Sequence, residues 1–160
     1  MQIETQRYGY DCPLGRLYLT IREQRVVGLE YEPAEPTLFE NNLPTGEIKS
    51  WLEQYFRGEP IAKDLIQVDQ GTEFQQKVWR IMLQIPYGQT LSYGEVSSKL
   101  GSAPRAVGQA CKRNPIPVFI PCHRIVGKHS IGGYEGAVSG HKISRKQWLL
   151  AHERADARTI

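Results

Sequence analysis

A cysteine and a histidine stand side by side in the stretch "IPVFIPCHRIVGKHSIGGYEG", and they are the residues best suited to covalent chemistry in this chain. A thiol with an ordinary pKa is only a few per cent thiolate near neutral pH, so a nucleophilic cysteine needs a base or a positive environment. His123 is the candidate base for Cys122, and Glu153 is a carboxylate that could orient the imidazole ring. The pattern therefore indicates nucleophilic chemistry by a thiol.

The adjacency of Cys122 and His123 restricts how they can cooperate. Neighbouring side chains in an extended segment point to opposite sides, so the imidazole reaches the thiol more easily through a turn or a bridging water than directly. Arg124 is either a structural ion-pair partner or part of the positive field. The alternative interpretation makes Cys122 a core residue of an apolar loop and His123 a surface residue.

The other cysteines, Cys12 and Cys111, predict neither a disulfide framework nor a zinc site. Three cysteines are too few and too scattered for disulfides, and none belongs to the closely spaced pairs that structural zinc usually needs. We therefore expect a reduced compartment and no metal. The chain shows no segment of signal-peptide type and no apolar run of membrane-spanning length, so we expect a cytoplasmic protein without a membrane partner.

Charge divides the chain into two unlike parts. Residues 1–70 contain 7 Lys and Arg against 12 Asp and Glu, a net charge of −5, whereas residues 71–160 contain 13 against 5, a net charge of +8. A basic part joined to an acidic one suggests that the C-terminal part meets a polyanion, most often nucleic acid. A chance distribution of surface charge is the alternative.

Residues 1–66 have the pattern of a compact α+β unit. Apolar residues alternate at Leu17, Leu19 and Ile21 and return at 26–29 after the polar turn "REQ", which predicts a β-hairpin. The segment "TGEIKSWLEQYFRG" has apolar residues at helical spacing and ends at a glycine, so it predicts one helix packed on the sheet. The polar stretch that follows, 67–71, is the predicted linker.

Residues 72–160 are predicted to be mainly helical. Capping boxes at Thr72, Ser92 and Ser144 mark three helix starts, and the last of these helices runs through "RKQWLLAHER". Two short helices, about 94–100 and 103–113, are separated by the turn "LGSAP" and make a helix-turn-helix candidate. After them, "VFI" predicts a buried extended segment and "GKHSIGGYEG" a wing-like hairpin.

The helix predicted at 103–113 carries a basic and polar stripe. Arg105, Gln109 and Lys112 align along one face and are interleaved with alanine and glycine. Small residues let a helix backbone approach another surface closely, so this face could meet DNA. A tightly packed internal helix with solvated charges fits the same spacing.

The run "IPCHRIV", preceded by "RAVGQACKRNP" and followed by "GGYEG" and "WLLAHE", resembles the O6-alkylguanine-DNA alkyltransferases, also called methylated-DNA–protein-cysteine methyltransferases. The match runs from about Thr72 to Glu153 in the same order and nearly the same spacing. The N-terminal unit resembles the family's ribonuclease-H-like domain more loosely. The resemblance implies an α+β N-terminal ribonuclease-H-like domain and a mainly α C-terminal winged helix-turn-helix domain.

The activity that the resemblance implies is direct repair of alkylated DNA. The family moves an alkyl group from the O6 atom of guanine, and less readily from the O4 atom of thymine, irreversibly to a cysteine. No cofactor is needed, because displacement at the alkyl carbon requires only a thiolate, in-line geometry and a stabilised leaving group. The expected partner is double-stranded DNA carrying O6-alkylguanine, bound through the minor groove with the damaged base flipped out. We expect a monomer in solution, located with the nucleoid in a prokaryote, with cooperative binding on DNA left open.

The resemblance also implies roles for residues around the thiol. Cys122 is the acceptor, His123 its base through a water, and Glu153 the carboxylate that orients His123. Asn114 corresponds to the hinge asparagine between the recognition helix and the active-site loop. Tyr93 matches the tyrosine that crowds the 3′ phosphate and whose hydroxyl serves the guanine N3.

A second group of residues is implied to bind the substrate. Arg105 corresponds to the finger that fills the space left by the flipped nucleotide, and Tyr134 walls the base pocket. The carbonyls of Cys122 and Ile125 and the amide of Glu135 are expected to read the guanine edge. The remaining candidate DNA contacts lie on the helix 103–113: Ala106, Gln109 and Lys112.

The sequence departs from the family pattern in two places, and three other functions are alternatives to alkyl transfer. Glu135 stands where many relatives carry a small residue, and "AVSGHKIS" before the last helix is longer than in the shorter members. The rivals are a non-catalytic binder of alkylated DNA, a cysteine hydrolase that uses Cys122, His123 and Glu153, and a transcription regulator. The presence of Cys122 argues against the first rival, because relatives that only bind lesions have lost it.

Overall fold

The computed structural model describes residues 4–39, 41–137 and 139–158, which form two compact units. The first unit is Met1–Asp69 and the second is Gln70–Ile160. The division falls inside the polar stretch 67–71. Among the described residues, no helix is both long enough and apolar enough to span a bilayer.

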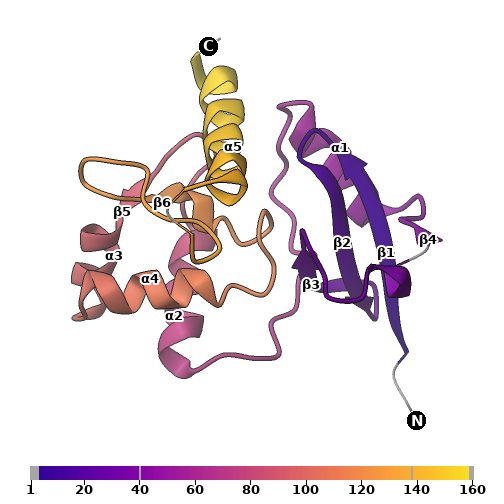
Figure 1. Cartoon of the computed structure of the whole chain (residues 1–160), viewed down its shortest axis with the longest axis horizontal. Helices are drawn as coiled ribbons and strands as arrows, with labels where there is room; N and C mark the ends of the chain where they lie inside the picture. Colours follow the sequence, from indigo (N-terminus) through magenta and orange to yellow (C-terminus); the bar gives the residue numbers. More distant parts are fainter. Residues whose placement is uncertain (1–3, 40, 138, 159–160) are drawn as a thin grey trace. The chain divides into compact units, whose positions relative to one another are not determined.

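The N-terminal unit is a four-stranded sheet with one α-helix (Figure 1). The strand order is β3-β2-β1-β4, with β4 parallel to β1 and the other neighbours antiparallel. The elements are β1 Thr5–Cys12, β2 Gly15–Arg22, β3 Arg25–Glu30, the 3-10 turn η1 Pro36–Phe39, β4 Asn41–Asn42 and α1 Glu47–Phe56. The predicted hairpin and helix are confirmed as β2–β3 and α1. Sequence reasoning missed β1, in which only one of eight residues is buried, so it lacks the alternation that marks a strand.

The core of this unit lies between the sheet and α1. Leu17 and Leu19 of β2 are fully buried and Ile21 is 5% exposed, as expected for alternate positions on one face of a strand. Leu52 and Tyr55 of α1 are buried as well. The alternating apolar residues of the sequence are therefore the side chains on the inner face of the sheet.

The C-terminal unit contains four α-helices and two short paired strands among its described residues (Figure 1). Strand β5, which directly precedes helix α3, pairs in parallel with strand β6, which directly follows the cysteine turn. The elements are α2 Glu73–Leu83, β5 Leu91–Ser92, α3 Tyr93–Leu100, α4 Pro104–Lys112, the 3-10 turn η2 Cys122–Arg124, β6 Ile125–Val126 and α5 His141–Arg158.

Two of the three predicted capping boxes are confirmed. At Thr72 the side chain accepts from the amide of Gln75 at 3.1 Å, and the Gln75 side chain accepts from the Thr72 amide at 2.9 Å. Ser92 and Glu95 form the same reciprocal pair at the start of α3. The third prediction, at Ser144, is wrong: α5 begins at His141, and the Ser144 amide already makes a helical bond to a carbonyl four residues earlier.

The helix-turn-helix is confirmed within one residue at each end. Gly101 ends α3 in the left-handed conformation, at φ 59° and ψ 40°, and Pro104 opens α4. Glycine adopts this conformation without the strain that a side chain introduces, and proline has the φ that a first helical residue needs. These two residues account for the sharp turn between the helices.

The segments on either side of Cys122 are more tightly folded than the sequence predicts. Residues 118–120 are buried as expected, but they are not extended, because Val118 has φ 74° in a turn closed by a bridge between Pro117 and Ile120. In place of the wing-like hairpin, the described residues after β6 form an irregular loop with one tight turn. There Tyr134 and Ala137 exchange two backbone hydrogen bonds of 2.9 Å.

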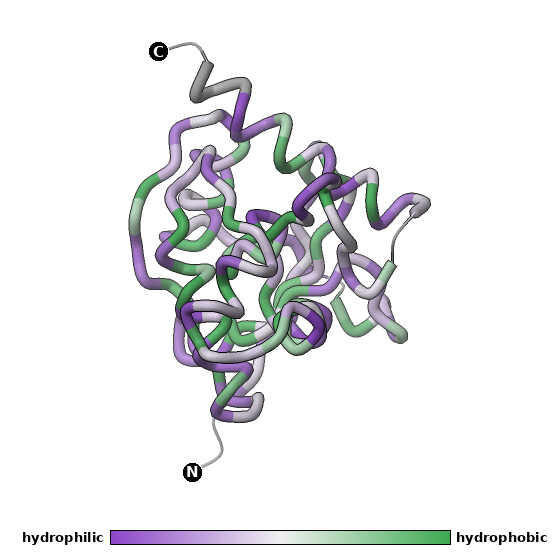
Figure 2. Tube along the Cα trace, turned by 90° about the vertical axis from the view of Figure 1, so that its left-hand side faces the viewer, coloured by the Kyte–Doolittle hydropathy of each residue, from purple (hydrophilic) through white to green (hydrophobic). Residues whose placement is uncertain are grey.

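The core of the C-terminal unit is centred on Trp79. Its indole nitrogen donates to the carbonyl of Ala110 in α4 at 2.9 Å, and it is 2% exposed. Val78, Met82 and Val107 around it are fully buried. Along the helices the trace changes between green apolar and purple polar positions, as amphipathic packing requires (Figure 2).

Two glycine-to-alanine substitutions should shift stability in opposite directions. Neither Gly101 nor Gly108 has an atom within 4 Å of an added Cβ, so packing does not decide the outcome. Gly101→Ala should destabilise the C-terminal unit by ~1 kcal/mol, because alanine is strained at a positive φ. Gly108→Ala, inside α4, should stabilise it by roughly 0.5–1 kcal/mol through helix propensity. Urea unfolding measures both, and shifts of the same sign would contradict this account.

Candidate active site

Cys122 opens the 3-10 turn η2 and is almost fully buried, at 6% exposure. Its amide donates to the carbonyl of Ile120 at 2.8 Å, and the amide of Arg124 donates to that of Pro121 at 2.9 Å. The cysteine therefore lies in a turn. A turn of this kind is one of the two ways in which adjacent side chains can cooperate.

His123, Glu153 and Arg124 form a buried network that joins η2 to α5. His123 Nε2 lies 2.6 Å from Glu153 Oε2. Arg124 donates to the same carboxylate twice, from Nε at 2.8 Å and from Nη2 at 3.1 Å. His123 is fully buried and Glu153 is 1% exposed, so His123 is not the surface residue of the alternative interpretation.

The protonation states in this network follow from burial and pairing. Burial alone would raise the pKa of Glu153, but hydrogen bonds and charges from His123 and Arg124 outweigh it and hold that pKa well below its usual range. Burial lowers the pKa of His123 below 6.5 despite the pull of Glu153. Near neutral pH, the carboxylate is charged and the imidazole is neutral.

A neutral His123 leaves one ring nitrogen as a proton acceptor. Nε2–H donates to the charged carboxylate of Glu153, so Nδ1 carries the free lone pair. Nδ1 is buried and has no hydrogen-bond partner within the part of the chain that the structure describes. The network thus holds the imidazole in the tautomer that a general base requires.

Asn114 braces the turn that precedes the cysteine. Its Nδ2 donates to the carbonyl of Ile120 at 2.8 Å, and its Oδ1 accepts from the amide of Ile116 at 2.9 Å. A hydrogen bond from Asn114 also lowers the pKa of the Cys122 thiol. One side chain at the end of α4 therefore couples the helix to the turn and to the sulfur.

Lys146 of α5 is a site residue that sequence reasoning missed. It is fully buried, and its Nζ donates to the carbonyls of Ile125 at 2.6 Å and Gly133 at 2.9 Å. Burial lowers the pKa of Lys146 to about 8. Lys146 comes three residues after Ile143 and three before Leu149, so helical spacing puts it on the apolar face of α5. This spacing would have allowed its burial to be predicted from the sequence.

The Cys122 thiol is mainly protonated at rest. Burial raises its pKa to about 11, while Asn114 and Lys146 lower it and Glu135 raises it further. A thiol in this state is a poor nucleophile until a base removes its proton. The neutral imidazole of His123 is the base that the site supplies.

A pocket of about 450 Å³ opens between α4 and the loop around residues 133–137. Its lining includes six of the residues predicted to act on substrate or DNA: Tyr93, Arg105, Gln109, Lys112, Tyr134 and Glu135. The charge of Cys122 raises the pKa of Tyr93 and of Cys111, and both line the pocket. Burial is the larger cause of both shifts, but an ionised Cys122 would also be felt at these two residues of the pocket wall.

Tyr93 is fixed against the loop that closes the pocket. A Cβ at Gly132 would come within 2.7 Å of its ring, so only glycine allows this approach, and the Tyr93 hydroxyl donates to the carbonyl of Gly133 at 3.5 Å. Burial raises the pKa of Tyr93 to about 12, so the phenol keeps its proton. A proton-donating hydroxyl is thereby held at the pocket.

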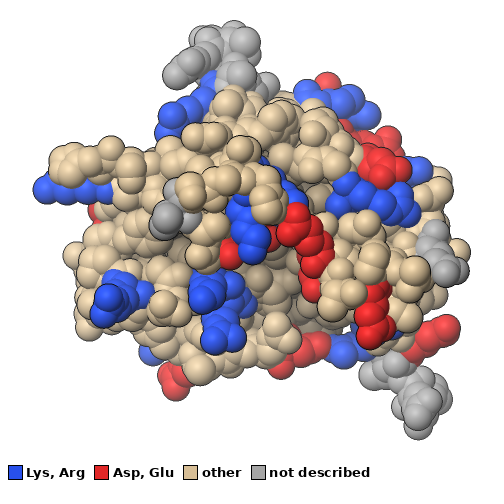
Figure 3. All heavy atoms as spheres, viewed as in Figure 1, with Lys and Arg blue, Asp and Glu red and all other residues tan. Residues whose placement is uncertain are grey.

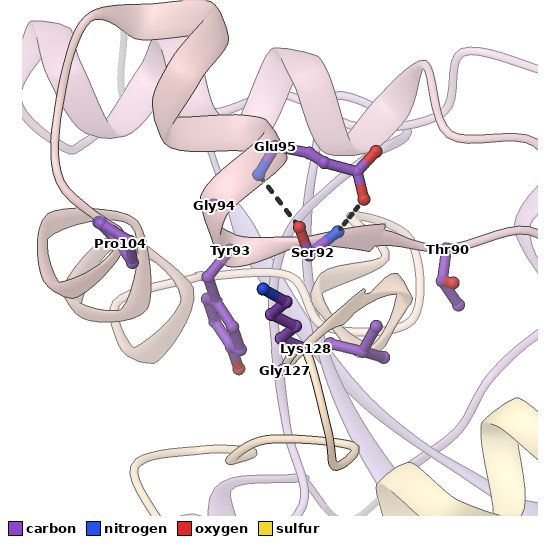
Figure 4. Close-up of a pocket in the computed structure, with 9 residues that line it drawn as sticks. Thr90, Ser92, Tyr93, Gly94, Glu95, Pro104, Gly127 and Lys128 are labelled. Atoms are coloured by element: carbon purple, nitrogen blue, oxygen red, sulfur yellow. Dashed lines mark hydrogen bonds between the residues drawn. The ribbon is translucent and has the colours of Figure 1, made fainter.

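Two of the predicted contacts do not line this pocket. Ala106 is half-buried on α4, and Ile125 is fully buried with its carbonyl bonded to Lys146. A second hollow, of about 720 Å³, adjoins the first at Tyr93 and is bordered by the start of α3 and by Lys128 (Figure 4). On the face that Figure 3 shows, several Lys and Arg side chains lie at the surface of this unit.

The C-terminal unit combines a helix-turn-helix that borders a pocket with a buried thiol and a neighbouring histidine. This combination defines a class of protein that brings nucleophilic chemistry to a nucleic-acid surface. The family model "6-O-methylguanine DNA methyltransferase, DNA binding domain" matches residues 73–155, and "6-O-methylguanine DNA methyltransferase, ribonuclease-like domain" matches 7–70. The chain belongs to this family. The predicted resemblance and fold class are thus confirmed.

Individual relatives match over nearly their whole length. The constitutive methylated-DNA–protein-cysteine methyltransferase of Bacillus subtilis is 39% identical over 156 residues, which cover 90% of this chain and 92% of the relative. The corresponding protein of Mycobacterium leprae is 40% identical over 153 residues, covering 90% and 89%.

Solved structures agree with these matches. The crystal structure of the Mycobacterium tuberculosis O6-methylguanine methyltransferase has a TM-score of 0.79 and 34% identity, covering 96% of this chain and 94% of that one. The structure of Mycobacterium tuberculosis OGT in complex with DNA has a TM-score of 0.77 and 35% identity, covering 94% of both.

The buried neutral imidazole should make stability depend on pH. Because the pKa of His123 is lower in the folded state than the usual 6.5, the unfolded chain binds more protons below that pH. The free energy of unfolding should therefore fall as pH decreases from 6.5 towards the folded pKa, by up to ~1.4 kcal/mol per pH unit. The carboxylate of Glu153, whose folded pKa is depressed, adds to this loss only below about pH 4.5.

Urea unfolding of three proteins between pH 7.5 and 5.5 measures this effect. His123→Gln should flatten the dependence seen in the wild type, whereas His129→Gln, on the exposed surface, should keep it. Equal slopes in all three proteins would show that His123 is not buried in the neutral form.

Proposed function

We propose that this protein repairs DNA by moving the alkyl group of O6-alkylguanine to Cys122, with O4-alkylthymine as a poorer substrate. Each molecule then acts once. The observation that carries the proposal is the buried network of His123 and Glu153 next to the thiol, beside a pocket on the helix-turn-helix.

The transfer is a displacement at the alkyl carbon. The Cys122 proton passes through a water to His123 Nδ1, and Sγ attacks the carbon as the carbon–O6 bond breaks. The electron pair of that bond remains on the guanine, which takes up at N1 the proton that His123 releases through water, and this gives the normal base. The Tyr93 hydroxyl, turned from the Gly133 carbonyl towards N3 of the guanine, donates a hydrogen bond that stabilises the leaving base.

The product explains why turnover is not expected. A thioether has no good leaving group, and burial raises the pKa of the Cys111 thiol, which lines the same pocket, so that this second sulfur is held protonated. The charged carboxylate of Glu153 stabilises the imidazolium that forms during the step. This arrangement suits one fast reaction without a cofactor.

Access to the O6 atom requires the damaged nucleotide to leave the base stack. Arg105, the second residue of α4, is exposed and lies on the rim of the pocket, where it suits the space that the flipped base leaves. The alanine and glycine residues of α4 let the helix lie close to the shallow minor groove. Lys112 and Gln109 then face the backbone on the same side.

Reaction with a duplex that carries one O6-methylguanine tests the acceptor. Intact mass and peptide mapping should show a stoichiometric gain of one methyl group on Cys122 alone, together with restored guanine. Cys122→Ala should bind the lesion and transfer nothing, whereas Cys12→Ala, a matched substitution in the other unit, should transfer normally. Lesion binding by the wild type without a mass gain would identify a recognition protein, and repeated turnover would identify a hydrolase.

The role of Arg105 separates base flipping from chemistry. Arg105→Ala should slow repair of the duplex by about tenfold to a hundredfold, since the intercalated side chain compensates for an unstacking cost of a few kcal/mol. Its reaction with free O6-benzylguanine, which needs no flipping, should stay close to that of the wild type. Single-turnover rates on the two substrates measure this, and equal losses would exclude the finger role.

A further inference from the structure

An ion pair between Glu135 and Arg145 lies at the pocket and has no part in the proposed transfer step. Arg145 Nη1 is 3.0 Å from Glu135 Oε2, and the side chains are 15% and 23% exposed, respectively. Glu135 occupies the tight turn between Tyr134 and Ala137 with φ 52°, a conformation that glycine adopts more easily than glutamate. The pair thus joins the pocket loop to α5.

The carboxylate of Glu135 acts on the reacting atoms even though it is paired. Glu135 lines the pocket, and its negative charge raises the pKa of the Cys122 thiol. The carboxylate therefore opposes ionisation of the sulfur, although the charge of Lys146 has the larger effect on the thiol. An alkyl group held between guanine O6 and the sulfur lies in the same field.

The positive charges around the pocket are arranged differently. Lys112 lies at the rim, with its stem 3.0 Å from where a Cβ of Gly136 would be, and it is exposed to solvent. Lys146 is fully buried, but its ammonium donates to the carbonyls of Ile125 and Gly133. The rim therefore favours DNA phosphates, while the half-buried carboxylate of Glu135 is the acidic group in the wall.

We propose that the Glu135–Arg145 pair selects the alkyl group by its charge, so that the site accepts neutral groups and discriminates against anionic ones such as carboxymethyl. Repulsion between like charges is strong in a half-buried site, where water screens poorly. The inference rests on the proposed transfer to Cys122 and adds a determinant of substrate class to it.

Two adducts of equal size isolate charge from shape. Duplexes carrying O6-carboxymethylguanine or its amide, O6-carbamoylmethylguanine, have the same reacting carbon and nearly the same volume. The measured quantity is the ratio of single-turnover transfer rates to Cys122 for the anionic and the neutral adduct, followed by intact mass. In the wild type, the anionic adduct should react about tenfold more slowly than its amide, as expected for like charges in such a site.

Three variants test which residues set this ratio. Glu135→Gln keeps the shape of the side chain and removes its charge, so the ratio should rise towards one. Arg145→Gln removes the compensating cation, so the ratio should fall below that of the wild type. Glu73→Gln, an exposed carboxylate at the start of α2, should leave the ratio unchanged.

The outcomes separate this inference from the proposed function. Transfer of both adducts at a ratio that is the same in the wild type and Glu135→Gln would overturn the charge filter and leave alkyl transfer standing. No transfer of the amide or of a methyl group by the wild type would overturn the proposed function together with the filter. If Glu135→Gln takes up no methyl group because it misfolds, the ratio for Arg145→Gln decides alone, and an unchanged value there would overturn the filter.

Discussion

The carboxylate of Glu153 is the interaction on which the rest of the site depends. It accepts from His123 and twice from Arg124, and it lies 3.4 Å from the amide of Gly88. These donors belong to η2 and to the loop after α2, so one side chain of α5 fixes two other segments of the unit. A buried carboxylate is costly unless its partners satisfy it, and the loss of Glu153 would leave a histidine and an arginine buried without their acceptor.

Several charged groups of the site influence the pKa of the Cys122 thiol. Lys146 favours the thiolate, Glu135 opposes it, and burial opposes it most strongly. With the pKa near 11, the sulfur is not a stored thiolate, so its reaction requires removal of the thiol proton. In the proposed transfer, His123 takes that proton, and Glu153 holds the imidazole in the tautomer that accepts it.

The sequence predicted the parts of the fold that local chemistry determines. The capping boxes at Thr72 and Ser92 and the helix-turn-helix around Gly101 rest on residue types at fixed spacing. The grouping of His123 with Glu153 came instead from the need of a histidine base for an orienting carboxylate and from the family resemblance. The turn before the cysteine was not predictable in the same way, because it depends on hydrogen bonds from Asn114 that form only in the folded chain. Lysine is rarely buried, so Lys146 was overlooked although its helical spacing placed it on the apolar face.

A buried and protonated thiol suits the single-turnover transfer proposed above. Alkylation of Cys122 by an adventitious reagent would remove one molecule permanently, oxidation would remove it until the sulfur is reduced again, and both reactions proceed through the thiolate. Burial at 6% exposure and the raised pKa suppress the thiolate when no substrate is bound. In the proposed transfer, the proton passes to His123 as the sulfur attacks the alkyl carbon. The same burial that weakens the nucleophile at rest therefore preserves it for that transfer.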